Sequence, residues 1–307
     1  MSIRPADPPT EVLPEWLAVA ERMPARGRVL VIGPTDSGKS TIAWWLAGWL
    51  HGRDRAGPQS QPGDVAVVDT DVGQSRIGPP ACVGRCILGA TDCCFYFVGA
   101  TSPDRRPAGT LKATVTACEH ASQAGVHWTV VDTTGYVDDT TAIALKTAKI
   151  SKLRPCHVLA IGDAPALADI LKPWREDPSV SVHRVARPPA ARAKSRPERT
   201  RWRQDGFAPW LSGANLHWLD GTGRRFLDTP PAELYARNPS VSGQLKGLLV
   251  GFSDAEGKGL ALGLLRAFDF AAGKALVLCR EEALAATTVA FGALRLRPDG
   301  TQIPEPR

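Results

Sequence analysis

Short apolar runs alternate with segments of helical pattern from the start of the chain to about residue 214. The runs that predict buried strands span residues 27–33, 64–71, 93–99, 127–135 and 157–162. The segments that predict helices span residues 13–24, 39–52, 110–125, 140–153 and 164–174. Parallel strands read as continuous apolar runs because helices cover both faces of their sheet. The alternation therefore predicts an α/β fold with a largely parallel sheet flanked by helices.

The pattern changes after residue 214. Short apolar runs are separated there by turn sequences at residues 254–259 and 271–274, as in β-hairpins. A glycine-rich match in this region, GKGLALG (257–263), lacks a strand before it and a helix after it, so we interpret it as a hairpin turn. We expect three parts: an N-terminal extension with a short helix (1–26), an α/β domain (27–214) and a small β-rich C-terminal domain (215–307).

Composition narrows the class of protein. Of the 307 residues, 43% are hydrophobic and 22% charged, which is typical of a globular chain. The formal net charge of +6 fits a polyanionic partner, and equally a basic protein without one. The apolar runs are too short for a membrane span, and the N-terminus, with Asp7 and Glu11, does not resemble a signal peptide. The seven cysteines lack zinc-site spacing and predict free thiols in a reducing, cytoplasmic location.

The segment GPTDSGKST follows a predicted strand, opens a predicted helix and matches the pattern G-x-x-x-x-G-K-[ST]. In such a P-loop the backbone amides surround the phosphates, Lys39 reaches the β and γ oxygens, and Ser40 binds Mg²⁺. The predicted nucleotide-binding residues are Gly33, Pro34, Thr35, Asp36, Ser37, Gly38, Lys39, Ser40 and Thr41. Phosphate would repel Asp36, so its side chain should turn outward. It would then either accept amides of its own loop or face the acceptor side of the site.

Acidic residues end two further predicted strands. Asp69 and Asp71 close the second strand in DTDVGQ, and Asp132 closes the fourth in DTTGY. Residues two apart on an extended backbone share a face, and ligands of open α/β sheets lie beyond the carboxyl ends of the strands. We therefore expect the three carboxylates to converge with the P-loop. Phosphoryl transfer needs one carboxylate that orders Mg²⁺ and one that accepts the proton of the acceptor hydroxyl.

A basic segment follows the fifth predicted strand. Residues 183–203 carry eight lysine and arginine side chains and one acid, Glu198. The segment can fold over the phosphate site as a lid, taken as about residues 183–205. Its arginines can then neutralise the transferred phosphoryl group or hold a nucleic-acid backbone. A solvated basic linker is the alternative interpretation.

Four segments in this order resemble the polynucleotide 5′-hydroxyl kinases related to the RNA-processing kinase of the cleavage-and-polyadenylation machinery. They are GPTDSGKST, DTDVGQSRIGPP, DTTGY and SRPERTRWRQDGFAPWLSG. The resemblance covers about residues 27–214 and, more loosely, the C-terminal part. It implies a P-loop kinase that uses ATP and Mg²⁺ to phosphorylate the 5′-hydroxyl of single-stranded RNA, possibly also DNA, in nucleic-acid processing or repair.

The resemblance also implies roles for single residues. Asp69 would be the general base, and Lys39 with the lid arginines Arg196 and Arg199 would complete the catalytic set. The clasp that grips the transferred phosphate and the acceptor side would comprise Asp71, Gln74, Thr133, Thr134, Gly135 and Tyr136. The magnesium residues would be Ser40, Asp69 and Asp132. Trp202 and Trp210 are candidates for contacts with the strand.

The sequence departs from the family pattern in two respects. The clasp ends in Tyr136 where the family has Trp, which keeps an aromatic face for stacking on a base or for packing. The large N-terminal β-domain of eukaryotic members has no counterpart before residue 27, which predicts a minimal, prokaryotic-style form and leaves protein partners unknown.

Other functions also fit the sequence. One is an RNA-associated P-loop ATPase or assembly factor without kinase activity, in which the paired aspartates position water. Another is an inactive scaffold, which the intact Lys39, Ser40 and Asp69 disfavour. A small-molecule kinase is disfavoured by the basic segment. Preference between RNA and DNA depends on recognition of the 2′-hydroxyl, which the sequence does not reveal.

Overall fold

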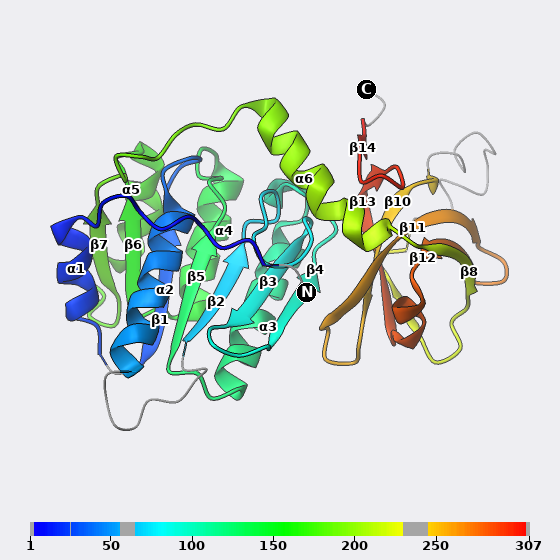
Figure 1. The fold of residues 1–307 in the computed structure, drawn as a ribbon, viewed down its shortest axis with the longest axis horizontal. Helices are drawn as coiled ribbons and strands as arrows, with labels where there is room; N and C mark the ends of the chain where they lie inside the picture. Colours follow the sequence, from blue (N-terminus) through cyan, green and yellow to red (C-terminus); the bar gives the residue numbers. More distant parts are fainter. Residues whose placement is uncertain (1–2, 25, 56–64, 230–244, 305–307) are drawn as a thin grey trace.

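The computed structural model describes residues 3–24, 26–55, 65–229 and 245–304; for residues 53–55 it describes the backbone alone. Its strands form two sheets of seven strands each. Figure 1 shows the first sheet between its helices at the left and the second sheet at the right. Helix α6 (Arg196–Leu211) lies between them along the upper side of the molecule.

The first sheet has the strand order β4-β3-β2-β5-β1-β6-β7. Its strands are β1 (Gly27–Ile32), β2 (Val65–Thr70), β3 (Cys82–Ile87), β4 (Cys93–Phe97), β5 (Trp128–Thr133), β6 (His157–Ile161) and β7 (Ser181–Val185). Five adjacent strands pair in parallel, in the order β2-β5-β1-β6-β7. Strand β3 is antiparallel to β2, and β4 is antiparallel to β3. The predicted α/β fold with a largely parallel sheet is confirmed.

Helices cover both faces of this sheet, which explains its continuous apolar strands. The remaining helices are α1 (Pro14–Glu21), α2 (Lys39–Arg55), α3 (Pro107–Gln123), α4 (Thr140–Leu153) and α5 (Pro165–Leu171). Val29 and Val31 of β1 pack in a core cluster with side chains of α1 and α2. Leu30 and Ile32 point the other way, into a cluster with side chains of α3, α4 and α5. Successive side chains of β1 thus pack against helices on opposite faces of the sheet.

Three elements of this domain were not predicted. Strand β3 carries a glycine and a buried arginine, Gly84 and Arg85, so it shows no apolar run. Strand β7 is the edge of the sheet and is partly exposed, with a polar sequence. Helix α6 begins inside the basic segment, where Ser195 and Glu198 form a capping box that satisfies its first amides. The local capping signal was present in the sequence, but the high charge concealed it.

The second sheet forms the β-rich C-terminal part, as predicted. Its strands are β8 (Asn215–Leu219), β9 (Arg225–Leu227), β10 (Leu248–Ser253), β11 (Gly259–Asp269), β12 (Lys274–Cys279), β13 (Thr288–Leu296) and β14 (Gln302–Ile303). Glycines let it approach β4 closely: a Cβ on Gly259 would lie 2.1 Å from the ring of Phe95, and one on Gly251 would lie 2.2 Å from the ring of Phe97. The predicted boundaries at residues 26/27 and 214/215 stay predictions.

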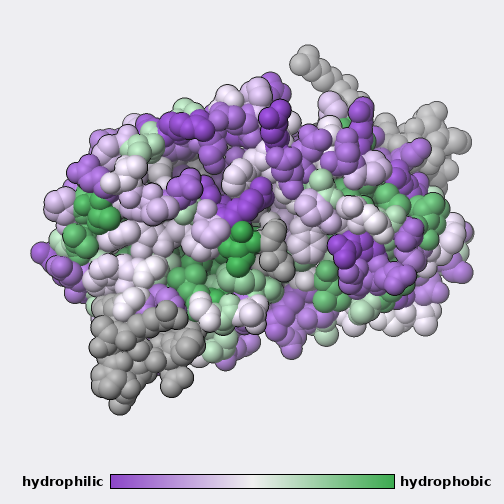
Figure 2. All heavy atoms as spheres, in the orientation of Figure 1, coloured by the Kyte–Doolittle hydropathy of each residue, from purple (hydrophilic) through white to green (hydrophobic). Residues whose placement is uncertain are grey.

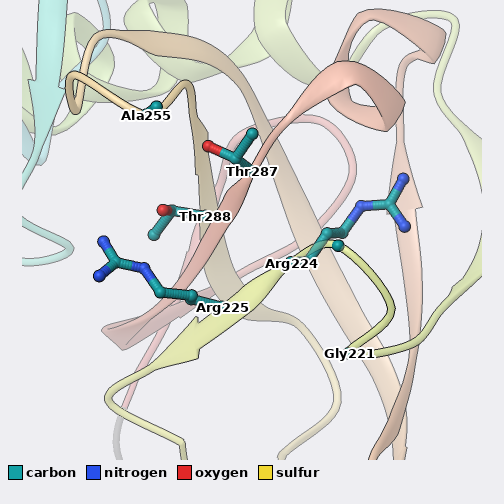
Figure 3. A pocket seen from close by; sticks show the side chains of 7 residues that line it. Gly221, Arg224, Arg225, Ala255, Thr287 and Thr288 are labelled. Carbon is teal, nitrogen blue, oxygen red and sulfur yellow. The ribbon is translucent and has the colours of Figure 1, made fainter.

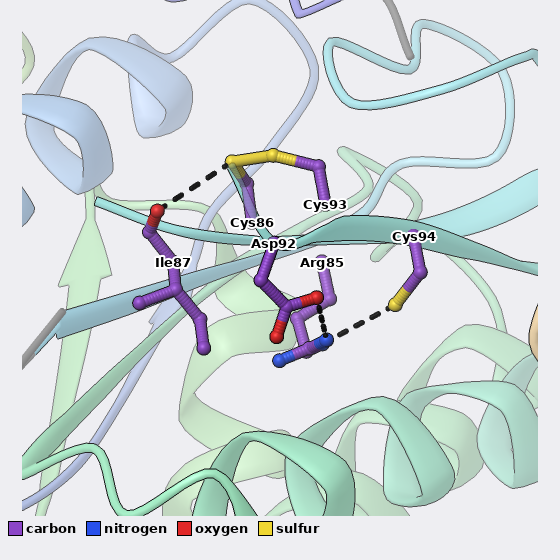
Figure 4. Close-up of a disulfide and its surroundings, with 6 residues drawn as sticks. All are labelled: Arg85, Cys86, Ile87, Asp92, Cys93 and Cys94. Atoms are coloured by element: carbon purple, nitrogen blue, oxygen red, sulfur yellow. Dashed lines mark hydrogen bonds and ion pairs between the residues drawn. A yellow bond between two sulfur atoms is a disulfide. The ribbon is translucent and has the colours of Figure 1, made fainter. Parts of the chain in front are cut away.

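Two of the seven cysteines are paired, contrary to the expectation of free thiols. Cys86 and Cys93 lie directly opposite each other on β3 and β4 and form a disulfide. Figure 4 shows this bond beside Arg85, whose guanidinium lies 2.7 Å from the Asp92 carboxylate and 3.3 Å from the Cys94 sulfur. The expectation failed because β3 was not recognised, so the cross-strand register was unknown.

The described part of the chain contains no helix that is long and apolar enough to cross a membrane. A cavity of about 480 Å³ lies in the second sheet (Figure 3). It is lined by Gly221, Gly223, Arg224, Arg225, Ala255, Thr287 and Thr288. No residue predicted from the P-loop, the carboxylates or the clasp is among them, so this cavity is separate from the candidate site.

Candidate active site

The loop between β1 and α2 forms a phosphate-binding turn. Gly38 has φ +86°, a conformation that glycine adopts without cost, and a Cβ there would lie 2.5 Å from Pro188 Cγ. Lys39 is buried, and its Nζ donates to the Pro34 carbonyl at 2.5 Å and to the Ser37 hydroxyl at 3.4 Å. Burial lowers the pKa of Lys39, and Asp132, Asp71 and Asp36 oppose that shift. The amides of the loop and the start of α2 provide an anion site.

Two buried carboxylates lie side by side next to this loop. Asp69 of β2 and Asp132 of β5 are register partners on adjacent parallel strands, and each is 1% exposed. Asp69 Oδ1 accepts the amide of Asp71 at 2.9 Å, and its Oδ2 accepts the amide of Arg76 at 2.5 Å. These bonds fix the Asp69 carboxylate at the carboxyl edge of the sheet.

Asp71 follows directly after the strand that carries Asp69. Strand β2 ends at Thr70, and the chain then turns. The Asp71 Oδ1 atom accepts the amides of Gly73 and Gln74, both at 3.0 Å, so Asp71 caps the turn of the DTDVGQ motif. Asp71 still lies close enough to raise the pKa of Asp69 through its charge.

The two buried carboxylates have different surroundings. Burial, followed by the charges of Asp132 and Asp71, raises the pKa of Asp69 to about 7, although two amide hydrogen bonds oppose the shift. Burial also raises the pKa of Asp132, against a hydrogen bond from Ser40 and the charge of Lys39. Within the described residues, Asp132 Oδ1 is a buried oxygen without a hydrogen-bond partner. A free carboxylate oxygen beside a serine hydroxyl fits a hard divalent cation such as Mg²⁺.

The predicted clasp lies against the P-loop. Thr133 Oγ1 donates to the Val31 carbonyl at 2.7 Å, which ties the clasp to β1. Thr35 Oγ1 donates to the Gly135 carbonyl at 3.3 Å, and a Cβ on Gly135 would lie 2.4 Å from Thr35 Cα. The Tyr136 hydroxyl donates to the carboxylate of Asp139, the N-cap of α4, at 2.7 Å. A glycine is therefore required where the clasp touches the loop.

The basic segment folds over the P-loop and ends in α6. The Arg199 guanidinium forms an ion pair with the Asp36 carboxylate. The amide of Lys194 donates to Asp36 Oδ2 at 3.1 Å. Gln74 Nε2 donates to the Arg199 carbonyl at 3.3 Å, so the DTDVGQ motif, which ends in Gln74, also contacts α6. Arg196 is exposed at the start of α6, and its side chain forms no ion pair or hydrogen bond with another described residue.

Asp36 has a role that neither sequence interpretation contained. Its φ of 58° is left-handed, and its carboxylate pairs with the guanidinium of Arg199. It accepts an amide, but from Lys194 of the lid rather than from its own loop. The side chain therefore connects the P-loop to the lid, a contact between residues 163 positions apart.

The two tryptophans that are candidates for contacts with nucleic acid have different surroundings. Trp210 packs edge-on against Phe95 at 4.9 Å between ring centres, inside the contact between the two sheets. Trp202 donates its indole N–H to the Ser75 carbonyl at 3.2 Å. Three cations lie against its ring, Arg4 at 4.1 Å, Lys194 at 5.1 Å and Arg76 at 5.4 Å. Arg4 and Arg76 were not anticipated, because only the fold brings them to α6.

Comparison with known proteins agrees with this geometry. Residues 33–213, more than half of the chain, match the family described as mRNA cleavage and polyadenylation factor CLP1 P-loop. A polyribonucleotide 5′-hydroxyl-kinase from Methanocaldococcus jannaschii is 29% identical over an alignment of 201 positions, which covers 62% of this chain and 52% of that relative. A protein of the same name from Pyrococcus abyssi is 25% identical over 92% of this chain and 90% of its own length. One from Pyrococcus horikoshii is 25% identical over 90% of this chain and 87% of its own.

The fold is also found among solved structures. The structure of a wild-type Clp1p–Pcf11p complex superimposes with a TM-score of 0.61 at 11% identity, covering 91% of this chain and 77% of that one. At this identity the likeness concerns the fold alone.

Proposed function

The chain belongs to the mRNA cleavage and polyadenylation factor CLP1 P-loop family, and we propose that it is an ATP-dependent polynucleotide 5′-hydroxyl kinase. The archaeal relatives named polyribonucleotide 5′-hydroxyl-kinase support this assignment and favour RNA as the substrate. The observation that carries it is the buried Asp69 carboxylate beside the P-loop, with a pKa raised to about 7. A carboxyl group with that pKa is suited to accept a hydroxyl proton near neutral pH. The kinase unit is proposed to comprise residues 27–214.

The proposed reaction moves one phosphoryl group. The 5′-hydroxyl oxygen forms a bond to the γ-phosphorus as the bond to the β–γ bridging oxygen breaks, and ADP leaves. The hydroxyl proton passes to Asp69. The P-loop amides and Lys39 hold the phosphates, and the clasp residues Thr133–Tyr136 lie against the loop on the other side. Positioning and charge neutralisation supply most of the catalysis of phosphoryl transfer.

Ser40 and Asp132 are the proposed magnesium residues. The Asp132 oxygen that lacks a protein partner is the best-supported ligand among the three residues predicted from the sequence. Both oxygens of Asp69 already accept backbone amides, which favours the role of base over that of metal ligand for this residue. Mg²⁺ held by Ser40 and Asp132 would neutralise charge that develops during transfer.

Arg199 is the proposed lid arginine. It is held at the P-loop by Asp36, whereas Arg196, the other candidate, faces solvent. An arginine at this position can stabilise charge on the transferred phosphoryl group. The ion pair with Asp36 holds the guanidinium at the loop, where its remaining N–H groups can contact a phosphate while the pair stays intact.

The exposed basic side chains near the lid are proposed to hold the polynucleotide backbone. They are Arg184, Arg187, Arg192, Arg196 and Arg201. Figure 2 shows hydrophilic residues gathered along the upper edge of the molecule, where Figure 1 places the chain leading into α6. Phosphate contacts of this kind bind without regard to base sequence. We place the reaction in the cytoplasm, where ATP is supplied.

Transfer of label from [γ-³²P]ATP to oligonucleotides tests the proposal. Single-stranded RNA with a 5′-hydroxyl should become labelled in the presence of Mg²⁺, and the same RNA with a 5′-phosphate should not. DNA and duplex substrates in parallel reactions report the preference. Hydrolysis of ATP without any transfer to a 5′-hydroxyl end would instead identify an RNA-associated ATPase.

A further inference from the structure

Two lysines are buried on the inner face of α4, directly behind the site. Lys146 and Lys149 are each 1% exposed and lie three residues apart, so they share one face of the helix. Within the described residues, no carboxylate oxygen lies within ion-pair distance of either ammonium nitrogen. Burial of a lysine without a counter-ion is costly, so hydrogen bonds must hold each group. Burial, then Lys149 and Lys39, lowers the pKa of Lys146 well below its usual range.

The two lysines hold different parts of the structure. Lys146 Nζ donates to the carbonyl oxygen of Thr134 at 2.6 Å, in the middle of the clasp. Lys149 Nζ donates to the hydroxyl of Thr70, at the end of β2, at 2.7 Å. Of the two lysines, therefore, Lys146 alone bonds to the clasp backbone.

The bond from Lys146 fixes the orientation of one peptide group. The described chain has no cis peptide bond, so the Thr134 carbonyl and the following Gly135 amide point in opposite directions. With the carbonyl turned toward α4, the Gly135 N–H points away from it. Gly135 lies against Thr35 of the P-loop, and its amide donates no hydrogen bond within the described residues. An unpaired amide N–H next to a phosphate loop is suited to donate a hydrogen bond to an anionic oxygen.

We propose that Lys146 is a positioning residue for phosphoryl transfer, which fixes the Thr134–Gly135 peptide so that the Gly135 N–H donates to the transferred phosphoryl group. The inference rests on the proposed function, because it assigns a donor to that reaction. Lys146 itself does not touch the substrate. Its effect on the rate arises through the clasp backbone, whose free donor is already oriented before the nucleotide binds.

Lys146→Met tests the proposal, with Lys149→Met as the matched control. Both variants remove a fully buried amine from the same helix face, and a methionine side chain fills a similar volume. Each variant leaves one buried acceptor without its lysine donor, the Thr134 carbonyl or the Thr70 hydroxyl, so both variants should lose a similar amount of stability. A difference in kcat between the two variants therefore reflects the lost bond to the clasp and not the removal of a buried amine.

The expected result is a loss of kcat in Lys146→Met alone. Removal of one oriented donor lowers kcat by about 10²–10³-fold. If the Thr134–Gly135 peptide of the variant still samples the correct orientation, kcat should fall less, by about tenfold. The KM for ATP should change little, because the P-loop amides are untouched. The Lys149→Met variant should keep kcat within about threefold, since Thr70 is not part of the clasp. Equal losses in both variants, or none in Lys146→Met, would overturn the proposal.

Hydrogen–deuterium exchange provides a readout that needs no acceptor. Peptides covering residues 133–136 should exchange faster in Lys146→Met than in the wild type and in Lys149→Met. Unchanged exchange in this segment contradicts the inference whatever the enzyme's substrate proves to be. If the wild type transfers no phosphoryl group but exchange rises as expected, the proposed function fails and the assignment of Lys146 to the clasp backbone stands.

Discussion

The contact between Asp36 and Arg199 predicts that the P-loop and the lid act together in catalysis. Asp36→Asn removes the charge of the carboxylate and little else. Asparagine tolerates the left-handed φ of 58° found at this position, and its amide oxygen can still accept the Lys194 N–H. Arg199→Gln removes the partner. Together with the double variant, these changes form a thermodynamic cycle that isolates the interaction.

The burial of the pair sets the expected magnitude. The Asp36 side chain is 15% exposed and that of Arg199 is 33% exposed. Exposed ion pairs contribute about 0–1 kcal/mol, and buried hydrogen bonds to charged groups about 1.5–3 kcal/mol. A pair of intermediate burial should contribute about 1–2 kcal/mol, and about 1.4 kcal/mol corresponds to a factor of ten. We therefore expect Asp36→Asn to lower kcat/KM for label transfer by about five- to thirtyfold.

The assay is transfer of γ-phosphate from ATP to a 5′-hydroxyl RNA, with ATP affinity measured separately. Because Asp36 is proposed to act by placing Arg199, Asp36→Asn should have almost no further effect in the Arg199→Gln background. Arg192 belongs to the same basic segment but pairs with Glu198. The losses of kcat/KM caused by Asp36→Asn and by Arg192→Gln should therefore be additive. If the losses of kcat/KM caused by Asp36→Asn and by Arg199→Gln were additive, Asp36 would not act by placing Arg199.

Two further predictions concern the base and the lid. Since Asp69 must be deprotonated to accept a proton and its pKa is raised to about 7, kcat/KM should rise with pH up to about 7 and level off above it; bound Mg²⁺ would move the inflection downward. A pH profile from 5 to 9 checks this, and a rate that falls as the pH rises through 6 to 8 would contradict it. Arg199→Ala should lose at least about tenfold more kcat than Arg196→Ala, because only Arg199 reaches the P-loop; equal losses measured by label transfer would favour a general effect of charge.

Local motifs made the central part of the site predictable. The P-loop, Asp69 and Asp132 stand where an apolar strand ends, and parallel strands end at one edge of their sheet. Chain order and periodicity therefore suffice to bring these residues together. The turn-capping role of Asp71 was not predicted, because the strand ends at Thr70, one residue before it. Boundaries of this kind depend on hydrogen bonds that periodicity does not encode.

Contacts over long sequence distances were not predictable. The pairing of Asp36 with Arg199 needs both a left-handed turn residue and a helix that begins in a highly charged segment. Lys146 and Lys149 gave a weaker signal that could have been used, since both fall on the apolar stripe of the predicted helix 140–153. A lysine at a core position of an amphipathic helix indicates a buried polar contact. What the lysine contacts depends on the tertiary fold.

The most direct test of the account compares the wild type with Asp69→Asn in the label-transfer assay. Asn keeps the size of the side chain but cannot accept the proton from the 5′-hydroxyl. We predict that the wild type labels 5′-hydroxyl RNA and that Asp69→Asn is about 10²–10⁴-fold slower, with ATP still bound. Turnover by Asp69→Asn at a rate near that of the wild type would contradict the assignment of Asp69 as the base. The absence of labelled RNA with the wild type would contradict the kinase itself.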